Sequence, residues 1–368
     1  MEKNEILVIY GNNPEEMAYK LAEAAGLADL IGSRERRIGL KPNLVVARPA
    51  SEGATTHPEI VRGVAGYLQN NGFRRLLIME GAWVGARTTE AFSVCGYTQL
   101  ARDMGLDIID TQDDQARRYD CRGMDIEICG SAMGVDFMIN LPVMKGHCQT
   151  LVTCALKNNK GIIPNREKRR FHRLGLHKPI AHLNTAVKND FILVDGICGD
   201  MDFEEGGNPL PAGRMFAARD PVLCDAWAAG QMGYTPDEIP YIGLAEKLGV
   251  GCGNPAEARV RELNRSADSG ALAGGVPLPH PGGKARRLAP YIREDRACSA
   301  CYAALIFALS RMSRNELDRL QEPISIGQGF TGKTGSRGVG RCTARFDASL
   351  EGCPPSASRI LEFLRKQL

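Results

Sequence analysis

Short apolar runs alternate with amphipathic segments through the first two thirds of this chain. Runs with the strand pattern occupy residues 6–10, 38–46, 76–79, 106–109, 137–141 and 191–194. Segments with helical spacing of apolar residues occupy 15–31, 58–69, 89–104, 151–158, 180–188 and 221–232. This alternation predicts an α/β fold with a mostly parallel sheet covered by helices. Ligands of such sheets bind in the loops that follow the carboxyl ends of the strands.

Four cysteines near the C-terminus have the spacing of a metal site, namely Cys298, Cys301, Cys342 and Cys353. Two thiolates three positions apart reach a common point across one turn, and two more from distant segments complete a four-sulfur site. Such a site suits a 4Fe–4S cluster or, alternatively, a zinc ion. Cys342 and Cys353 are too far apart for a zinc knuckle, and Pro354 follows the last cysteine as in bacterial ferredoxin runs, so the pattern favours iron. The alternative is four ordinary buried thiols.

A chain of 368 residues exceeds what one hydrophobic core usually serves, so more than one domain is expected. We predict an α/β core domain over residues 1–262 and a small C-terminal iron–sulfur cluster domain over residues 294–368. Apolar patterns at 302–309 and 357–367 predict two helices beside the cluster. Residues 263–293 are rich in Gly, Pro and basic residues without periodicity, which predicts a linker or surface arm.

Composition narrows the setting and the partners. Twelve cysteines and an acidic, charged start without a signal peptide predict a cytoplasmic protein whose thiols serve metals or chemistry. A net charge of +3 gives no general nucleic-acid or membrane surface, and no apolar run is long enough to span a membrane. The expected partners are a small anionic molecule and, for an electron-transfer role, an electron-carrier protein.

Basic side chains gather after the strand expected at 137–141. The catalytic candidates are Lys145, His147, Lys157, His172 and His177. If a helix at 151–158 folds back on that strand, Lys145, Lys157 and Lys160 converge on a cationic pocket suited to carboxylate or phosphate. Histidines there would move protons near neutral pH. The alternative is a solvated basic loop, with single histidines satisfying local hydrogen bonds.

Two further strand-end loops supply candidate substrate-binding residues. Together with Lys160 these are Lys41, Asn43, Thr55, Thr56, His57 and Glu80. Thr56 and Glu59 fit a capping box, which competes with an anion site at the helix N-terminus as the explanation of the threonines. Glu80 ends a strand and is expected to be either a substrate ligand or a solvated carboxylate.

Residues 327–334 match the phosphate-loop pattern G-x4-G-K-T. A short strand pattern precedes them, but the Gly-rich sequence after Thr334 cannot begin a stable helix. A phosphate loop needs that helix, because its N-terminus helps to hold the phosphates. We therefore interpret the stretch as a loop that delivers Cys342.

Several motifs occur in an order that resembles the domain-of-unknown-function family 362. They are Lys-Pro-Asn-Leu at 41–44, Thr-Thr-His-Pro at 55–58, Leu-Pro-Val-Met-Lys at 141–145, Ala-Leu-Lys-Asn-Asn-Lys-Gly at 155–161, Val-Asp-Gly-Ile at 194–197 and Arg-Asp-Pro-Val at 219–222. The resemblance covers about residues 1–235 and implies an iron–sulfur cofactor, since members are often iron–sulfur proteins. The chain is more distantly similar to the nickel-pincer lactate racemases. The ferredoxin repeats of many family members do not occur here, because no third cysteine lies near Cys298 and Cys301.

The principal hypothesis is a cytoplasmic iron–sulfur oxidoreductase that acts on a small anionic substrate in a Lys/His-lined pocket. One alternative is an electron-transfer or cluster-handling binding module. A further alternative is a non-redox isomerase or lyase with a structural cluster. Four cysteine ligands would leave no iron open to substrate, which argues against use of the cluster as a Lewis acid.

Overall fold

The computed structural model describes residues 1–264 and 283–368, and these divide into two compact units. Unit 1 contains Met1–Ala82, Ala86–Glu167 and the described residues from His177 to Asn264. Unit 2 contains Trp83–Gly85, Lys168–Leu176 and the described residues from Gly283 onward. Most of the expected linker falls at 265–282, outside the described residues. The last part of the expected linker, residues 283–293, is folded and contributes a helix and most of a strand to unit 2.

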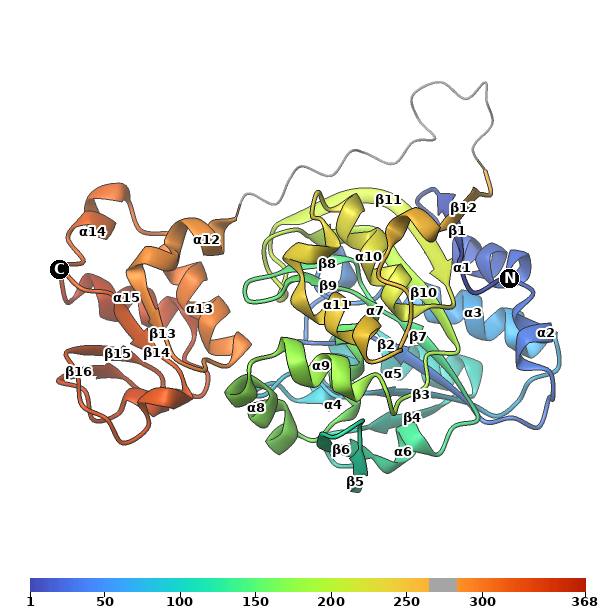
Figure 1. The fold of residues 1–368 in the computed structure, drawn as a ribbon, viewed down its shortest axis with the longest axis horizontal. Coiled ribbons are helices and arrows are strands. Elements are labelled where there is room, and N and C mark those ends of the chain that lie inside the picture. The colour runs from blue at the N-terminus through green and yellow to red at the C-terminus, as the bar shows by residue number, and fades with distance from the viewer. Residues whose placement is uncertain (265–282) are drawn as a thin grey trace. The chain divides into compact units, whose positions relative to one another are not determined.

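Unit 1 is built on an eight-stranded sheet with the order β12-β1-β11-β10-β7-β2-β3-β4 (Figure 1). The strands are β1 (Glu5–Tyr10), β2 (Ile38–Pro42), β3 (Leu76–Glu80), β4 (Asp107–Asp110), β7 (Phe137–Leu141), β10 (Phe191–Asp200), β11 (Pro209–Ala218) and β12 (Arg259–Glu262). Strand β11 pairs antiparallel with β1 and β10, and every other neighbouring pair is parallel. The predicted α/β class with a mostly parallel sheet is confirmed.

Burial on both faces explains why these strands are continuous apolar runs. Every position of β3 and β7 is buried. A parallel sheet is covered on both sides, so its strands carry apolar residues without alternation. On one face Ile78 of β3 joins a core with Leu21 and Val64, which come from two covering helices. Fully burying one such side chain contributes about 1.5–3 kcal/mol.

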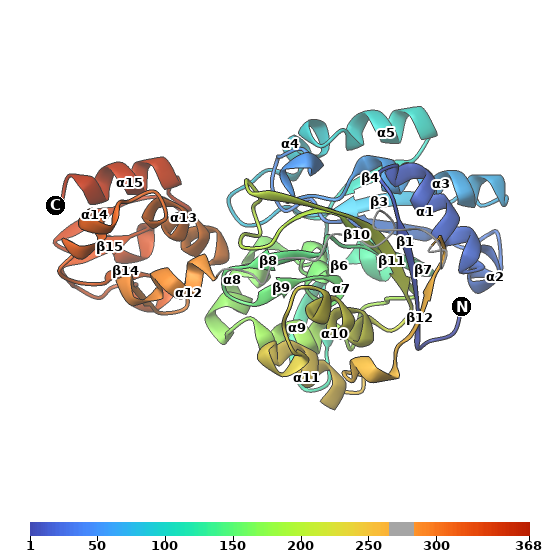
Figure 2. The ribbon, with the colours of Figure 1, turned by 90° about the horizontal axis from the view of Figure 1, so that it is seen from above.

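Helices cover the two faces of this sheet in separate groups (Figure 2). On one side lie α1 (Pro14–Ala24), α3 (Pro58–Asn70), α4 (Thr88–Val94) and α5 (Tyr97–Met104), and on the other α7 (Ala155–Asn158), α9 (His177–Leu183), α10 (Pro221–Gln231) and α11 (Pro240–Lys247). Short helices α2 (Leu27–Ile31) and α6 (Gly130–Met133) and strands β5 (Ala116–Asp120) and β6 (Asp125–Cys129) complete the connections. The helices expected at 15–31 and 89–104 are each broken, because Gly26 and Gly96 adopt left-handed backbone angles.

The helix expected at 151–158 is wrong in its first half. Leu151–Thr153 forms strand β9, which pairs antiparallel with β8 (Lys145–His147). Leu151 has a positive φ of 64°, which a helix does not allow. The apolar residues at 151, 152, 154, 155 and 156 show no clear period, so this short stretch is equally compatible with a strand and a helix. Only Ala155–Asn158 is helical, as α7.

Unit 2 contains a four-stranded parallel sheet of β13 (Ile292–Glu294), β14 (Ile324–Ile326), β15 (Arg337–Val339) and β16 (Ala348–Leu350), in that order. Its helices are α12 (Lys284–Leu288), α13 (Ser299–Leu309), α14 (Arg314–Asp318) and α15 (Ala357–Arg365), and α13 packs on α15. Helix α8 (Asn165–Leu174) begins in unit 1 and enters unit 2 at Lys168.

The phosphate-loop pattern does not have phosphate-loop structure. Strand β14 leads into a short 3-10 turn, η6 (Gln328–Phe330), and no helix follows Thr334 before β15 in this described stretch. Lys333 is exposed and lies 3.6 Å from the carboxylate of Asp295. No nucleotide-binding cradle is therefore formed.

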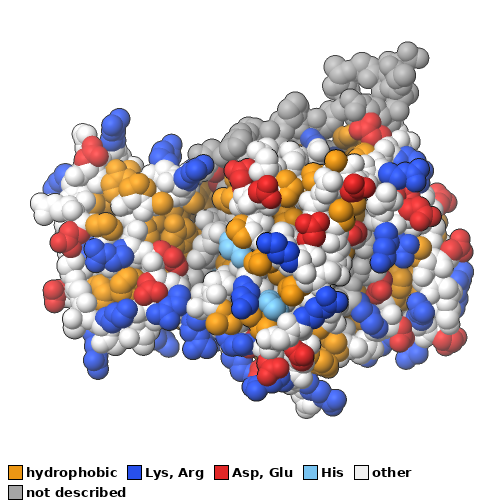
Figure 3. Space-filling model, viewed as in Figure 1, with side chains coloured by type: hydrophobic (Ala, Val, Ile, Leu, Met, Phe, Trp, Pro, Cys, Tyr) orange, Lys and Arg blue, Asp and Glu red, His pale blue; other side chains and the backbone are white. Residues whose placement is uncertain are grey.

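Charge is spread rather than concentrated on the surface. Figure 3 shows basic and acidic side chains interspersed over the visible face of each unit, as the small net charge implies. No helix in the described ranges has both the length and the apolar character needed to cross a bilayer.

Candidate functional site

A histidine and a buried carboxylate pair at the carboxyl edge of the unit 1 sheet. Asp195 lies within β10 and is fully buried. Its Oδ2 atom accepts the backbone N–H of His57 at 2.9 Å and lies 2.8 Å from His57 Nδ1. Burial disfavours the imidazolium, but the charge and hydrogen bond of Asp195, helped by Glu59, outweigh it and raise the pKa of His57. The His57 side chain is 16% exposed, and Nδ1 is the ring nitrogen that lies against Asp195.

The capping box expected at Thr56 and Glu59 is wrong. Thr56 Oγ1 instead donates to the carbonyl of Leu141 at 2.7 Å and accepts the backbone N–H of Asn43 at 2.9 Å. His57 is the N-cap of α3, and the Asp195 carboxylate accepts its N–H. The protein therefore supplies its own anion at this helix N-terminus. Thr55 Oγ1 is likewise engaged, since it donates to the carbonyl of Arg48 at 2.8 Å.

Lys41 and Glu80, expected to bind substrate, are partners of one another. They end the neighbouring strands β2 and β3, and the Lys41 ammonium forms an ion pair and hydrogen bond with the Glu80 carboxylate. Burial lowers the pKa of Lys41, and the charge of Glu80 opposes that shift. Lys41 also donates to the Pro42 carbonyl at 3.0 Å. The alternative that Glu80 is a solvent-exposed carboxylate is wrong, because its side chain is only 4% exposed.

Lys145 is almost completely buried and hydrogen-bonded to three oxygens. Its Nζ atom donates to Glu204 O at 2.8 Å, to Asn43 Oδ1 at 3.2 Å and to the carbonyl of Ala54. Burial first, and then repulsion from Lys157, lower the pKa of Lys145 to about 7. All three ammonium donors are therefore used within the protein. Lys145 holds three loops together rather than pointing into an open cleft.

Lys157 lies near Lys145 but is only partly buried. Its hydrogen bond among the described residues is to Thr153 Oγ1, at 3.3 Å. Burial lowers the pKa of Lys157 to about 8, against the attraction of Glu204 and Cys148. Lys160 lies in the next turn, η2 (Asn159–Ile162), and is also partly buried. Of the expected cationic pocket, the structure thus places Lys145 and Lys157 together and leaves Lys157 with donors to spare.

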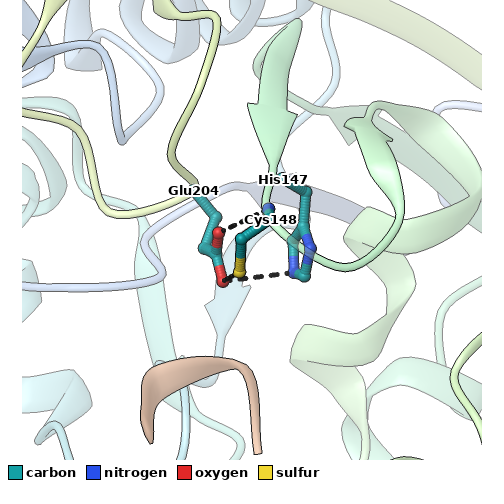
Figure 4. A group of neighbouring side chains, drawn as sticks. All are labelled: His147, Cys148 and Glu204. Carbon is teal, nitrogen blue, oxygen red and sulfur yellow. Dashed lines mark hydrogen bonds and ion pairs between the residues drawn. The ribbon is translucent and has the colours of Figure 1, made fainter. Parts of the chain in front are cut away.

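His147, Cys148 and Glu204 form a compact group with ligand atoms within 4.8 Å of one another, a spacing compatible with a metal ion (Figure 4). Glu204 approaches from the loop between β10 and β11. Its carboxylate accepts Cys148 N–H and Sγ–H, both at 3.2 Å, and lies 3.4 Å from His147 Nε2. Burial, and next the charge of Glu204, raise the pKa of Cys148 well above its usual value.

The hydrogen bonds of His147 decide which of its nitrogens carries the proton. Nδ1 accepts the backbone N–H groups of Gln149 at 3.0 Å and Thr150 at 3.2 Å, so the neutral ring carries its proton on Nε2, toward Glu204. A metal-ligating histidine usually donates its second ring N–H instead. The ligand atoms of His147, Cys148 and Glu204 are thus close enough to hold a metal ion. Their hydrogen bonds, however, are those of a protonated His147 Nε2 and a protonated Cys148 thiol beside the Glu204 carboxylate.

Two of the predicted catalytic histidines lie elsewhere. His177 begins α9, and its ring stacks on Tyr241 at a centroid distance of 5.9 Å. Burial lowers the pKa of His177. His172 is buried in the part of α8 that belongs to unit 2. His177 lies in unit 1, as Lys145 does, and its ring contact is with Tyr241.

Sequence patterns miss a second buried group, Cys154, Cys224 and Asp225. Asp225 Oδ1 accepts the N–H of Ala155 at 2.7 Å, so the carboxylate caps α7 from inside the protein. Burial raises the pKa of Asp225 to about 7, while the hydrogen bonds that it accepts oppose the shift. Hydrogen bonds also link the side-chain amides of Asn140, Asn158, Asn159, Asn184 and Asn189 into a network. Asn158 Nδ2 ties this network to the backbone carbonyl of Lys41.

In unit 2 the four predicted ligand cysteines follow strands of the one parallel sheet. Cys298 and Cys301 follow β13, Cys342 follows β15, and Cys353 follows β16. Carboxyl ends of parallel strands meet at one edge, so this topology brings the four segments together. Burial first, and then repulsion from Cys298, Cys353 and Cys342, raise the pKa of the Cys301 thiol. The four cysteines thus act on one another electrostatically.

Neighbouring backbone and side-chain groups fix these segments. Arg341 N donates to Gly352 O at 2.9 Å, which ties the turn of Cys342 to the segment of Cys353. Gln328 Nε2 lies 3.5 Å from Cys298 Sγ and 3.1 Å from the carbonyl of Arg169. Gln328 comes from the stretch with the phosphate-loop pattern, which here supplies a donor to sulfur.

Comparisons with known proteins each cover between half and two thirds of the chain. A sequence model described as "Domain of unknown function (DUF362)" matches residues 38–230, more than half of the chain. The thylakoid-associated protein sll1697 of Synechocystis sp. is 26% identical over 237 residues, covering 61% of this chain and 70% of that protein. The lactate racemase apoprotein of Thermoanaerobacterium thermosaccharolyticum gives a TM-score of 0.39 with 14% identity, over 58% of this chain and 54% of the racemase. The chain therefore spans little more than half of that racemase. The matched residues 38–230 include Lys41, His57 and Lys145 but none of the four C-terminal cysteines.

Proposed function

Since the chain belongs to the family described as a domain of unknown function (DUF362), membership supplies no reaction, and we propose from the site itself that the protein is an iron–sulfur oxidoreductase. The observation that carries this proposal is the gathering of four cysteines at the carboxyl ends of one parallel sheet. Cys298, Cys301, Cys342 and Cys353 would hold a 4Fe–4S cluster, which when bound supplies one-electron transfer.

Sulfur spacing supports a cluster over a single zinc ion. Tetrahedral zinc with Zn–S bonds near 2.3 Å brings its thiolates to about 3.8 Å from one another. In this fully described set, no three of the four sulfur atoms lie within 4.8 Å of one another. A cluster stands between its thiolates and keeps them farther apart than one ion does. The Gln328 amide beside Cys298 Sγ is the kind of donor that tunes cluster sulfur.

Substrate chemistry is assigned to the carboxyl edge of the unit 1 sheet. Lys157, with donors to spare and a lowered pKa, is proposed to bind the anionic group of a small substrate. Lys145 and Glu204 hold the loops around it. Asn43 lies against Lys145 and completes this edge. An electron-carrier protein is the proposed redox partner. The reducing cytoplasm is the proposed compartment, since none of the twelve cysteines, all of which lie in the described ranges, forms a disulfide.

Anaerobic purification tests the cofactor. We expect a brown protein with broad absorbance near ~400 nm and about four irons and four sulfides per chain. Cys298→Ala and Cys353→Ala should lose the colour, whereas Cys252→Ala, in unit 1, should keep it. One zinc per chain without sulfide would overturn the proposal. A cluster that dithionite fails to reduce, judged by its electron paramagnetic resonance signal, would leave a structural cluster and the isomerase or lyase alternative.

A further inference from the structure

We propose that His57 and Asp195 are a proton-exchange pair, in which His57 Nε2 gives a proton to, or takes one from, a small anionic ligand at the carboxyl edge of the unit 1 sheet. His57 is the catalytic residue of the pair, and Asp195 is a positioning residue. The anionic class of the ligand rests on the proposed function. The pair itself lies wholly in unit 1 and does not depend on whether the C-terminal cysteines hold a cluster.

Hydrogen bonds leave one ring nitrogen available. The backbone N–H and Nδ1 of His57 both address the same oxygen of Asp195, so Nδ1 carries a proton and Nε2 is the exchanging atom. The other carboxylate oxygen accepts the N–H of Ile197 at 3.1 Å. Proton transfer therefore converts the imidazolium into neutral imidazole, while the Asp195 carboxylate keeps its contact with Nδ1. This is the role of the carboxylate in a histidine–carboxylate pair, which orients the ring without itself taking the proton.

Charged and titratable groups around the pair favour the protonated ring. Glu59 lies on the first turn of α3, the helix that His57 caps. From β10, Cys198 is near enough to feel the charge of Asp195, and from α5 the Tyr97 hydroxyl donates to the carbonyl of Thr56 at 3.0 Å. Lys145 is bonded to the carbonyl of Ala54, three positions before His57 in the chain, and its ammonium is directed to that carbonyl and two other oxygens. A ligand anion would add to this preference for imidazolium.

Three other histidines of the described residues, His147, His177 and His182, lack this combination. His147 accepts two backbone N–H groups on Nδ1, which gives it the opposite tautomer. His182 pairs through Nδ1 with the Cys121 carbonyl at 2.8 Å, and the pKa of His177 is lowered by burial. His57 alone among these joins Nδ1 to a buried carboxylate while part of its ring is exposed.

Histidine NMR on the full chain tests the pair. The chain has six histidines, so ¹³C/¹⁵N-histidine signals can be assigned to His57 by its loss in His57→Gln. We expect a pKa above the usual 6.5, with the proton of the neutral ring on Nδ1. Asp195→Asn should lower that pKa, and His177→Gln should leave it unchanged. A wild-type His57 that titrates at or below 6.5, or that carries its neutral-state proton on Nε2, would overturn the proposal even if Asp195→Asn fails to fold.

Ligand linkage separates catalysis from a structural role. Inorganic phosphate and oxalate are the probes, and at least one should raise the pKa of His57 and protect Nε2 from carbethoxylation by diethyl pyrocarbonate. If neither anion changes the pKa or the carbethoxylation rate, the anionic ligand is wrong. Iron and sulfide content, measured on the same samples, reports separately on the proposed cluster.

Discussion

The ammonium group of Lys41 and the carboxylate of Glu80 form an ion pair at the ends of two neighbouring parallel strands, with both side chains almost completely buried. Gly161 makes room for the carboxylate, since a Cβ at that position would lie 2.3 Å from Glu80 Oε1. Charges removed from water need a partner of opposite sign, because an uncompensated buried charge is strongly destabilising. The pair and the glycine therefore act as one structural unit at the edge of the sheet.

Glu80→Gln should destabilise the protein by about 3–5 kcal/mol, because it leaves the Lys41 ammonium buried without a countercharge. Urea unfolding measures the change. Glu16→Gln is the matched control: it breaks the exposed Glu16–Lys20 pair, whose attraction is screened by water, and should change stability little. Equal effects at the two positions would contradict the buried pairing.

Gly161→Ala should perturb the same pair through its methyl group, because that methyl group would overlap the Glu80 carboxylate. We expect a loss of about 1–3 kcal/mol, the range for overpacking a filled interior. Gly66→Ala is the control, since a Cβ there meets nothing within 4 Å in the middle of α3. It should stabilise by about 0.5–1 kcal/mol through helix propensity. The contrast is read from thermal or urea unfolding.

Lys145→Met should destabilise the protein, because Glu204 O, Asn43 Oδ1 and the Ala54 carbonyl lose their donor. Each buried acceptor left unsatisfied costs about 1–3 kcal/mol, so a loss near 3 kcal/mol or more is expected. Lys333→Met, at an exposed position, should have little effect.

Stability near Lys145 should also depend on pH in a defined direction. The pKa of Lys145 is about 7 in the folded protein and 10.5 in its ordinary state. Between these values the unfolded chain binds the extra proton, so the Lys145 contribution to stability rises as pH increases from 7 toward 10.5. The stability difference between wild type and Lys145→Met should therefore grow with pH in that window. A difference that is flat with pH would show that the amine keeps its ordinary pKa.

Lys333→Ala should leave nucleotide affinity unchanged, because the loop of residues 327–334 is followed by strand β15 and does not run into a helix as a phosphate loop does. Fluorescent ATP binding with magnesium tests this. Tight binding that the substitution abolishes would restore the phosphate-loop interpretation.

The local pattern of apolar residues predicts those strands and helices in which every position is buried. The strand at Phe137–Leu141 has its predicted bounds, because all five positions are buried in one apolar run. Strand β11 is not predicted, because its first residues, Pro209–Pro211, are partly or fully exposed and contain two prolines typical of a loop. The order of strands depends on long-range pairing, which no local pattern encodes.

The sequence predicts which residue types occur at the candidate site, but it does not predict which residues contact one another there. His57 and Asp195 are 138 residues apart in the chain. Their pairing depends on the strand order β10-β7-β2, in which β7 lies between the other two strands. A usable signal existed nonetheless: Asp195 and Asp225 each interrupt an otherwise apolar stretch, where a buried carboxylate requires hydrogen-bond donors. The sequence assigns Lys145 to substrate binding because it does not reveal the protein oxygens that Lys145 contacts. These three acceptors come from distant segments of the chain, so no local pattern predicts them.

Unit 2 draws on three separated stretches of the chain, so the cysteine site is not an excisable module. A fragment beginning at Gly283 would lack Arg169, whose carbonyl holds the Gln328 amide beside Cys298. During synthesis Trp83 leaves the ribosome long before Cys353, and the unit closes only when the last strand and helix arrive. The proposed cluster would therefore assemble only after Cys353 and helix α15 have been synthesised, and not on a separately folded domain that begins at Gly283.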